Sequence, residues 1–166
     1  ASITIIQFRL SVSTYAATFI YNRFTHITHN SIKNSNRSET IRCDHCYGDV
    51  SISNNTVDNV SGGSYSLHYY ANDNYPRSLR IDNNTLSSRY YGIYVYNDKG
   101  SDNVSITGNR ISRNTNYSYD GWGLQAYHVG GLIERNEIRD FAGGIYLTGS
   151  FDYPATPKVQ HNTIIN

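Results

Sequence analysis

Several features that identify common classes of protein are missing from this sequence or scarce in it. The net charge is only +1, and no basic block or aromatic-basic motif occurs, so we expect no nucleic-acid partner. No apolar run approaches the ~18 residues that a membrane span requires, so we expect no membrane span. The N-terminus has no charged region followed by an apolar one, so no secretion signal is visible. Because the chain starts at Ala1 and lacks methionine, we expect a processed protein or a piece of a longer one.

The residue clusters that metals and many hydrolases need are also absent. No acidic cluster suits calcium, and no pair of facing carboxylates suits glycoside hydrolysis. Cys43 and Cys46 form a CxxC motif around His45, but no second ligand pair stands at the spacing of a zinc site. We therefore predict no metal and no cofactor. For the two cysteines, a short-loop disulfide and a pair of reduced, buried thiols both remain open.

The sequence is dominated by an eight-residue phrase that recurs along nearly its whole length. In the clearest copy, VSITGNRI at 104–111, an apolar residue lies three places before an asparagine and another lies two places after it. The opening residues fit with Ile6 in the asparagine position, Ile3 before it and Phe8 after it. The recurring asparagines are Asn30, Asn55, Asn84, Asn109, Asn136 and Asn162. Successive positions are 24, 25, 29, 25, 27 and 26 residues apart. Such a period predicts a solenoid, in which each repeat buries its apolar face only against its neighbours.

Each phrase predicts two short strands joined at a corner. Apolar and polar residues alternate around the asparagine, which is the period of a half-buried strand. Asparagine tolerates left-handed backbone and bonds to nearby main chain, so it suits the corner. Stacked copies can also bond to one another in a ladder. A third strand follows each phrase, at 40–43, 66–69, 92–95, 123–126 and 144–147, and less clearly at 15–18 in the first repeat.

Three strands per turn, one asparagine corner and third strands of the form G-I-x-V/L resemble the right-handed parallel β-helix of the pectin-lyase-like superfamily. NosD-type repeats are the nearest match. The resemblance implies an all-β fold, a right-handed parallel β-helix of about six to seven coils of three short strands with an asparagine ladder. Residues 1–166 would form a single domain. The resemblance says little about function, because this scaffold carries lyases, hydrolases, epimerases, phage tailspikes and structural proteins.

The outward side of the third strands is rich in tyrosine. If the apolar residues of these strands point inward, two columns of side chains point outward and stack about 4.8 Å apart. Along successive turns these columns are Arg42, His68, Tyr94, Gln125 and Tyr146, and then Asp44, Tyr70, Tyr96, Tyr127 and Thr148. Tyrosine offers a flat apolar ring and a polar tip, which suit the faces and hydroxyls of sugars. We predict carbohydrate binding at Tyr70, Tyr94, Tyr96, Tyr127 and Tyr146. The alternative is that the stacked rings only stabilise the sheet.

One group on this side of the molecule has the composition of a catalytic site. Arg42, Asp44, His68 and Tyr94 would lie on adjacent coils. Proton abstraction beside a uronate carboxylate needs a base such as tyrosine or histidine, and a cation such as arginine to hold the carboxylate. These four residues are therefore the candidate catalytic set if the protein is a polysaccharide lyase or a uronate epimerase. No family catalytic motif is recognisable at these positions.

Six Asn-x-Ser/Thr sequons make glycosylation a further possibility. The candidate acceptors are Asn36, Asn54, Asn59, Asn83, Asn103 and Asn116. Asn54 and Asn83 stand directly before two of the recurring asparagines, and we expect their side chains to face outward. Chance alone would produce most of these sequons in a chain so rich in asparagine, serine and threonine.

The interpretation favoured by the sequence is a non-catalytic, extracellular or cell-surface β-helix that is structural or binds carbohydrate. The alternative is the lyase or epimerase described above, and a third is a fragment whose active residues lie on other coils. The last phrase, with Val159 and Ile164, has the apolar residues to stack on the first phrase of another copy, with Ile3 and Phe8. We therefore expect a homo-oligomer formed by head-to-tail stacking into a filament.

Overall fold

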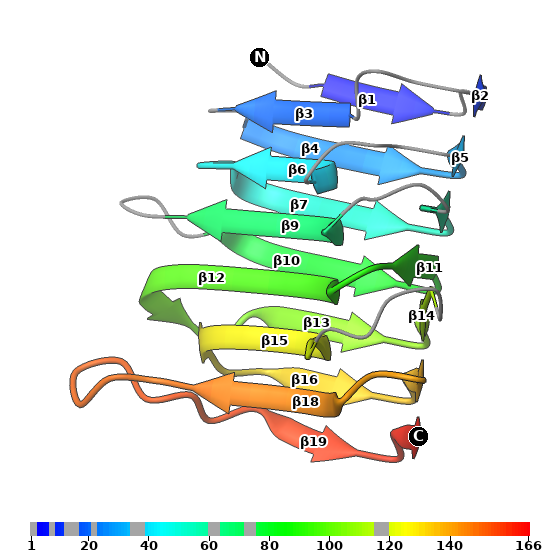
Figure 1. The fold of residues 1–166 in the computed structure, drawn as a ribbon. Coiled ribbons are helices and arrows are strands. Elements are labelled where there is room, and N and C mark those ends of the chain that lie inside the picture. Colours follow the sequence, from blue (N-terminus) through cyan, green and yellow to red (C-terminus); the bar gives the residue numbers. More distant parts are fainter. Residues whose placement is uncertain are drawn as a thin grey trace.

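The computed structural model describes residues 3–6, 9–11, 17–20, 23–33, 39–59, 64–71, 76–114 and 120–166, with side chains from Thr25 onward. These residues form strands and connecting turns (Figure 1). None of the described segments is an α-helix, so no helix capable of crossing a membrane occurs among them.

The strands belong to three sheets, and each sheet takes every third strand of the chain. The first sheet contains β1 (Ile3–Ile6), β4 (Arg23–Thr28), β7 (Tyr47–Ser53), β10 (Pro76–Asp82), β13 (Val104–Thr107), β16 (Leu132–Glu134) and β19 (Lys158–Gln160). The second contains β2 (Arg9–Ser11), β5 (Ser31–Lys33), β8 (Thr56–Asp58), β11 (Thr85–Ser88), β14 (Arg110–Arg113), β17 (Glu137–Arg139) and β20 (Thr163–Ile165). The third contains β3 (Ala17–Ile20), β6 (Glu39–Asp44), β9 (Tyr65–Ala71), β12 (Tyr91–Ser101), β15 (Trp122–Val129) and β18 (Gly143–Thr148).

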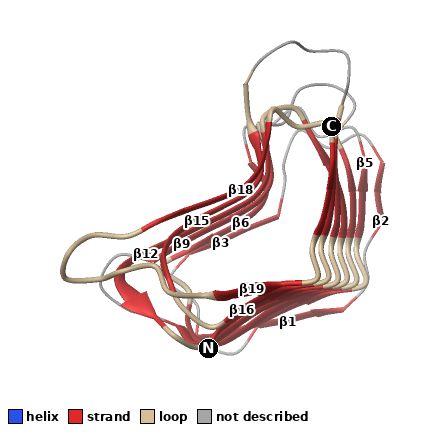
Figure 2. Cartoon of the chain, turned by 90° about the horizontal axis from the view of Figure 1, so that it is seen from below, coloured by secondary structure: helices blue, strands red, loops and turns tan. Residues whose placement is uncertain are grey.

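Each turn of the chain contributes one strand to each sheet, and neighbouring turns pair in parallel. The pairing β4–β7, for example, joins strands about one repeat apart, as do β5–β8 and β6–β9. The view along the axis shows the three sheets enclosing one narrow interior (Figure 2). The chain is therefore a parallel β-helix with an asparagine ladder, which confirms the fold class predicted from the repeat.

The core is a set of apolar columns that run along the axis. Ile27, Ile52, Ile81, Ile106 and Ile133 pair in register along the first sheet and are fully buried. The corresponding column of the second sheet is Ile32, Val57, Leu86, Ile111 and Ile138, and that of the third is Ile41, Leu67, Ile93 and Leu124. One or two apolar side chains per strand fill the interior, so every turn depends on its neighbours for burial.

The corner between the first and second sheets is a hydrogen-bonded ladder. In each turn, the backbone N–H and the side-chain Nδ2 of one asparagine both donate to Oδ1 of the asparagine in the next turn, as from Asn55 to Asn84 at 3.0 and 2.9 Å. Nδ2 also donates to a main-chain oxygen of the preceding turn, as from Asn55 to Ile27 at 2.9 Å. The ladder runs from Asn30 to Asn162. The amide therefore satisfies its donors and its acceptor inside the corner.

Left-handed backbone occurs one residue earlier than expected. The positive φ angles belong to the residues before the ladder asparagines, namely His29, Asn54, Asn83, Gly108, Arg135 and His161. The prediction that the recurring asparagine itself takes the left-handed conformation is wrong. Its essential property is the amide, which bonds along the axis, while the preceding residue makes the bend.

The predicted alignment of the first repeat is also wrong, by two residues. Ile5 pairs with Ile27 and Leu10 with Ile32, whereas Ile3 pairs with Thr25. The third strand of this repeat is Ala17–Ile20 in place of 15–18. This repeat has no asparagine to fix its position, and a shift of two residues leaves the alternation of a strand unchanged. Phe8 lies outside the described residues.

The glycines of the third strands mark a close approach of two sheets. A Cβ atom on Gly92 would collide with the Ile111 side chain and lie 2.5 Å from the Gly123 carbonyl oxygen. Gly123 stands in the same relation to Ile138, and Gly144 to Ile164. The glycine of one turn thus leaves room for the isoleucine of the next turn, which is why the third strands have the form G-I-x-V/L.

Candidate functional site

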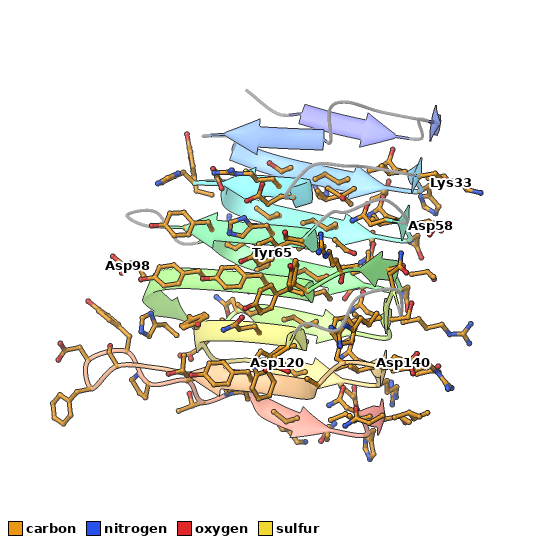
Figure 3. The ribbon with its side chains drawn as sticks, in the orientation of Figure 1. Lys33, Asp58, Tyr65, Asp98, Asp120 and Asp140 are labelled. Atoms are coloured by element: carbon orange, nitrogen blue, oxygen red, sulfur yellow. The ribbon has the colours of Figure 1, made fainter. Side chains whose placement is uncertain are left out.

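The outward side of the third sheet carries the predicted columns. Arg42, His68, Tyr94, Gln125 and Tyr146 pair in register along the sheet, as do Asp44, Tyr70, Tyr96, Tyr127 and Thr148. A third outward column precedes them and contains Glu39, Tyr65 and Tyr91. We call this surface, from β6 to β18, the tyrosine face; Tyr65 lies at the start of β9 and Asp98 near the far end of β12 (Figure 3).

The rings in the middle of the tyrosine face stack on one another along the axis. The ring centroids of Tyr65 and Tyr91 are 4.9 Å apart at an interplanar angle of 14°. Those of Tyr70 and Tyr96 are 5.1 Å apart at 17°. Parallel rings at this spacing cover each other's faces, so they present their edges and hydroxyl groups to solvent. These pairs stabilise the sheet, and their polar rims remain available to a ligand.

Toward β18 the rings are tilted relative to one another, and a larger part of each ring face is exposed than in the stacked pairs. Trp122 and Tyr146 have centroids 5.0 Å apart at 48°, and Tyr127 lies 6.1 Å from Tyr146 at 58°. Tyr146 is 37% exposed and Tyr153 is 39% exposed. His128 lies between Tyr96 and Tyr153, at 5.8 and 6.2 Å. A flat apolar ligand surface has more ring area to contact here than on the stacked pairs.

The four candidate catalytic residues come together at the other end of the face, on β6, β9 and β12. Arg42 Nε donates to Asp44 Oδ2 at 2.8 Å, and Arg42 Nη1 lies 3.7 Å from Glu39 Oε1. His68 Nδ1 lies 3.6 Å from the same Glu39 oxygen. The Tyr94 ring is 4.9 Å from that of His68, centroid to centroid. The Arg42 guanidinium is therefore already bound by acidic side chains of the protein.

Burial sets the protonation of this cluster. It lowers the pKa of His68, partly opposed by the charge of Glu39, so the imidazole is neutral near pH 7. Burial together with neighbouring phenols raises the pKa of Tyr94 to about 12, so this phenol keeps its proton. The hydrogen bond from Arg42 to Asp44 raises the pKa of Arg42. Of the candidate bases, only His68 has a free electron pair at neutral pH.

Sequence reasoning missed six side chains of this surface, namely Glu39, Tyr65, Tyr91, Trp122, His128 and Tyr153. Glu39 lies two residues before the inward Ile41, and Trp122 stands in the same relation to Leu124, so strand alternation would place both side chains inside. Their positions on the outer surface follow only from their contacts with outward side chains, those of Glu39 with Arg42 and His68 and that of Trp122 with Tyr146. The contacts of His128 and Tyr153 join a strand end to the 149–157 connection, and no period in the sequence indicates them. Within the described residues, no group of three histidine, cysteine or acidic side chains is placed to hold a metal ion.

Cys43 and Cys46 lie inside the β-helix where β6 turns into β7. The two cysteines form no disulfide, and both are fully buried. The hydrogen bond to Cys46, together with burial, raises the pKa of Cys43 well above its ordinary value. The hydroxyl of Tyr69 donates to the Cys46 carbonyl oxygen at 2.7 Å. The pair thus forms part of the core, away from the tyrosine face.

The sequon asparagines differ sharply in their exposure. Asn54 and Asn83 are exposed at the corner, and so are their hydroxyl partners Thr56 and Thr85. Asn103 is exposed, and its Nδ2 donates to the Arg77 carbonyl oxygen. Asn59 is 1% exposed, and its Nδ2 donates to Thr40 Oγ1. Asn36 and Asn116 lie outside the described residues.

Comparison with known proteins places this architecture in a class. The three parallel sheets and the asparagine ladder define a β-helix, and the model of the family described as the right handed beta helix region matches residues 39–166. The match covers most of the chain, so the protein belongs to the right-handed β-helix family, consistent with the resemblance to the pectin-lyase-like superfamily. No curated protein and no solved structure matched.

Proposed function

We propose that this protein is a non-catalytic, extracellular or cell-surface β-helix that binds carbohydrate on its tyrosine face. The observation that carries the proposal is a continuous array of aromatic rings from Tyr65 to Tyr146. The centroids of neighbouring rings in this array lie between 4.9 and 6.1 Å apart. Phenol edges and hydroxyls suit sugar hydroxyl groups, and the tilted rings near β18 suit the apolar faces of sugars.

The arrangement along the axis supports an extended ligand. The columns repeat once per turn and follow the axis, so the turns from β9 to β18 each offer at least one tyrosine to successive units of a chain. Side-chain hydrogen bonds hold the rims in place, from Gln125 to the Tyr127 hydroxyl at 2.6 Å and from the Tyr96 hydroxyl to Asp98 at 3.1 Å. A preformed surface loses less entropy on binding.

Binding to a polysaccharide array, followed by titration calorimetry on the hits, tests the proposal. We expect Tyr146→Ala and Trp122→Ala each to weaken binding by about tenfold, because they remove the tilted pair of rings at the β18 end of the face. Tyr47→Ala, which removes a half-buried tyrosine of the first sheet, is the matched control and should leave binding unchanged. Thermal melting confirms that all variants are folded. If Tyr47→Ala weakens binding as much as the other two variants, the tyrosine face is not the site.

The alternative is a lyase or epimerase, and the neutral imidazole of His68 beside Tyr94 is the observation that favours it. Against it, Arg42 is bound by Asp44, and the high pKa of Tyr94 makes that phenol a poor base. Incubation with uronate polymers, with formation of unsaturated products or C5 epimers as the readout, decides between the two. Turnover that is lost in both His68→Ala and Arg42→Ala would replace the non-catalytic proposal.

We also propose that copies of the protein stack head to tail. Val159 is 45% exposed and Ile164 is 49% exposed, although both occupy positions that are buried in the preceding turns. The exposed apolar side chains of the last turn lie beside the unpaired edges of β19 and β20. Both features favour stacking of a turn from another copy on this end. Sedimentation velocity across a dilution series should show concentration-dependent assembly that Ile164→Lys abolishes. Single particles of one chain at every concentration would contradict this proposal.

A further inference from the structure

The charges around the tyrosine face are mostly negative. Glu39 and Asp44 lie at one end, Asp98 near the far end of β12, and Asp120 two residues before β15 (Figure 3). The described cations beside them are Arg42, on the third sheet, and Arg89, which lies two residues before β12. His68 adds no charge near neutral pH, since burial lowers its pKa. Among the described side chains, carboxylates thus outnumber cations on this surface, although the whole chain is close to neutral.

The Arg42 guanidinium, on the third sheet itself, is not free for a ligand carboxylate. Arg42 Nε and Nη2 both contact Asp44 Oδ2, at 2.8 and 2.5 Å, and Nη1 faces Glu39. A uronate that binds Arg42 would have to displace an acidic side chain that is already positioned there. It would also leave Asp44, which is mostly buried, without its partner.

We propose that the tyrosine face selects uncharged glycans and excludes polyuronates. This inference rests on the proposed carbohydrate binding and names its ligand class. Repulsion by the surface carboxylates disfavours a polymer that carries a negative charge on every unit. Hydroxyl groups, in contrast, meet complementary partners on the same surface.

The hydrogen-bonding groups of the face suit hydroxyl groups. The phenols of Tyr94, Tyr96 and Tyr127 stay protonated at neutral pH because burial raises the pKa of each. A protonated phenol both donates and accepts, which matches a sugar hydroxyl and offers little to a carboxylate besides donation.

Matched pairs of polymers that differ only in charge test the inference. Polygalacturonate and alginate would each be compared with the carboxyl-reduced form of the same polymer, alongside an array of neutral polysaccharides, by affinity electrophoresis at low and high salt. We expect the wild-type protein to bind a neutral polymer and to bind the polyuronates at least about tenfold more weakly. The difference should shrink as salt screens the surface charges.

Variants that remove negative charges test whether the carboxylates of the tyrosine face are what weakens polyuronate binding. The double variant Glu39→Gln/Asp98→Asn should raise polyuronate binding severalfold, whereas Asp58→Asn on the second sheet should leave it unchanged. A polyuronate that binds wild-type protein as tightly as its reduced form, or more tightly, overturns the inference while glycan binding stands. Binding to no polymer of either kind overturns both the inference and the proposed function.

Discussion

Asn84 Nδ2 donates to Oδ1 of Asn109, 25 residues later in the chain, at 2.9 Å, and the backbone N–H of Asn84 donates to the same oxygen at 3.0 Å. The second hydrogen of Asn84 Nδ2 goes to the Ile52 carbonyl oxygen of the preceding turn. One amide thus joins three consecutive turns while it is 1% exposed. No other side chain of this size supplies two donors and a twofold acceptor, which explains why the position is occupied by asparagine in six successive turns.

Replacing Asn84 by aspartate should destabilise the protein by about 3 kcal/mol at neutral pH, because the change removes both donors and places a charge in a dry stack. Burial disfavours the charged carboxylate, so the loss develops as the pH rises through about 3.9 and is smallest in acid. Urea unfolding against pH measures both effects. Asn83→Asp adds the same charge to the exposed neighbouring residue and is the control. Equal stability of the two variants would contradict the ladder's role.

Gly92→Ala should cost about 1–3 kcal/mol, because the added methyl group overlaps the Ile111 side chain and approaches the backbone of Gly123. The double variant Gly92→Ala/Ile111→Ala removes the Cγ2 methyl group that the new Cβ meets, so it should lose less stability than the two single variants together. Thermal denaturation of the three variants checks this coupling. If Gly92→Ala alone is as stable as the parent, the two sheets have room to move apart at this corner.

The depressed pKa of His68 should make stability depend on pH. Since the unfolded chain binds a proton on this histidine more readily than the folded chain, stability is full above the ordinary pKa of about 6.5 and falls as the pH drops toward the folded value. NMR titration should place the midpoint of His68 below 6.5. His68→Gln should flatten the fall in unfolding free energy between about pH 7 and pH 5. A midpoint above 6.5 would show that Glu39 outweighs burial.

Cys43 and Cys46 should resist thiol reagents in the folded protein. Both are fully buried, and the pKa of Cys43 is raised, so little reactive thiolate forms at neutral pH. Titration with an aromatic disulfide reagent should detect no thiol before denaturation and two in guanidinium. Two thiols that react at once in the native protein would place the β6–β7 turn at the surface, and none after denaturation would indicate a disulfide.

Expression in a glycosylating host should modify Asn54 and Asn83 and leave Asn59 free. The first two sit with their threonines on the exposed corner, whereas Asn59 is buried and bonded to Thr40. Peptide mapping by mass spectrometry, with Asn54→Gln and Asn83→Gln as controls, identifies the occupied sites. A glycan on Asn59 would mean that modification precedes folding of this turn.

The repeat predicted most of the fold, and the predictions that failed have identifiable physical causes. The asparagines stack in the predicted ladder, and the two predicted outward columns of the third sheet pair as expected, since one misplaced residue would put apolar side chains on the outside. The first repeat was misaligned because it lacks an asparagine, and alternation alone permits a shift of two residues. The roles of Gly92 and Gly123 were not predicted, because a Cβ clash depends on the distance between two sheets.

The sequence by itself determined the solenoid, its three strands per turn and two of the outward columns of the third sheet, because burial of one face and the period of a strand are local properties repeated along the chain. Only the tertiary structure decided how those side chains interact. It showed that Tyr65 and Tyr91 cover each other's faces, that Arg42 is bound by Asp44, and that Tyr153 reaches His128. These relationships depend on rotamers, on the path of an irregular connection and on electrostatics between turns, none of which a one-dimensional period contains.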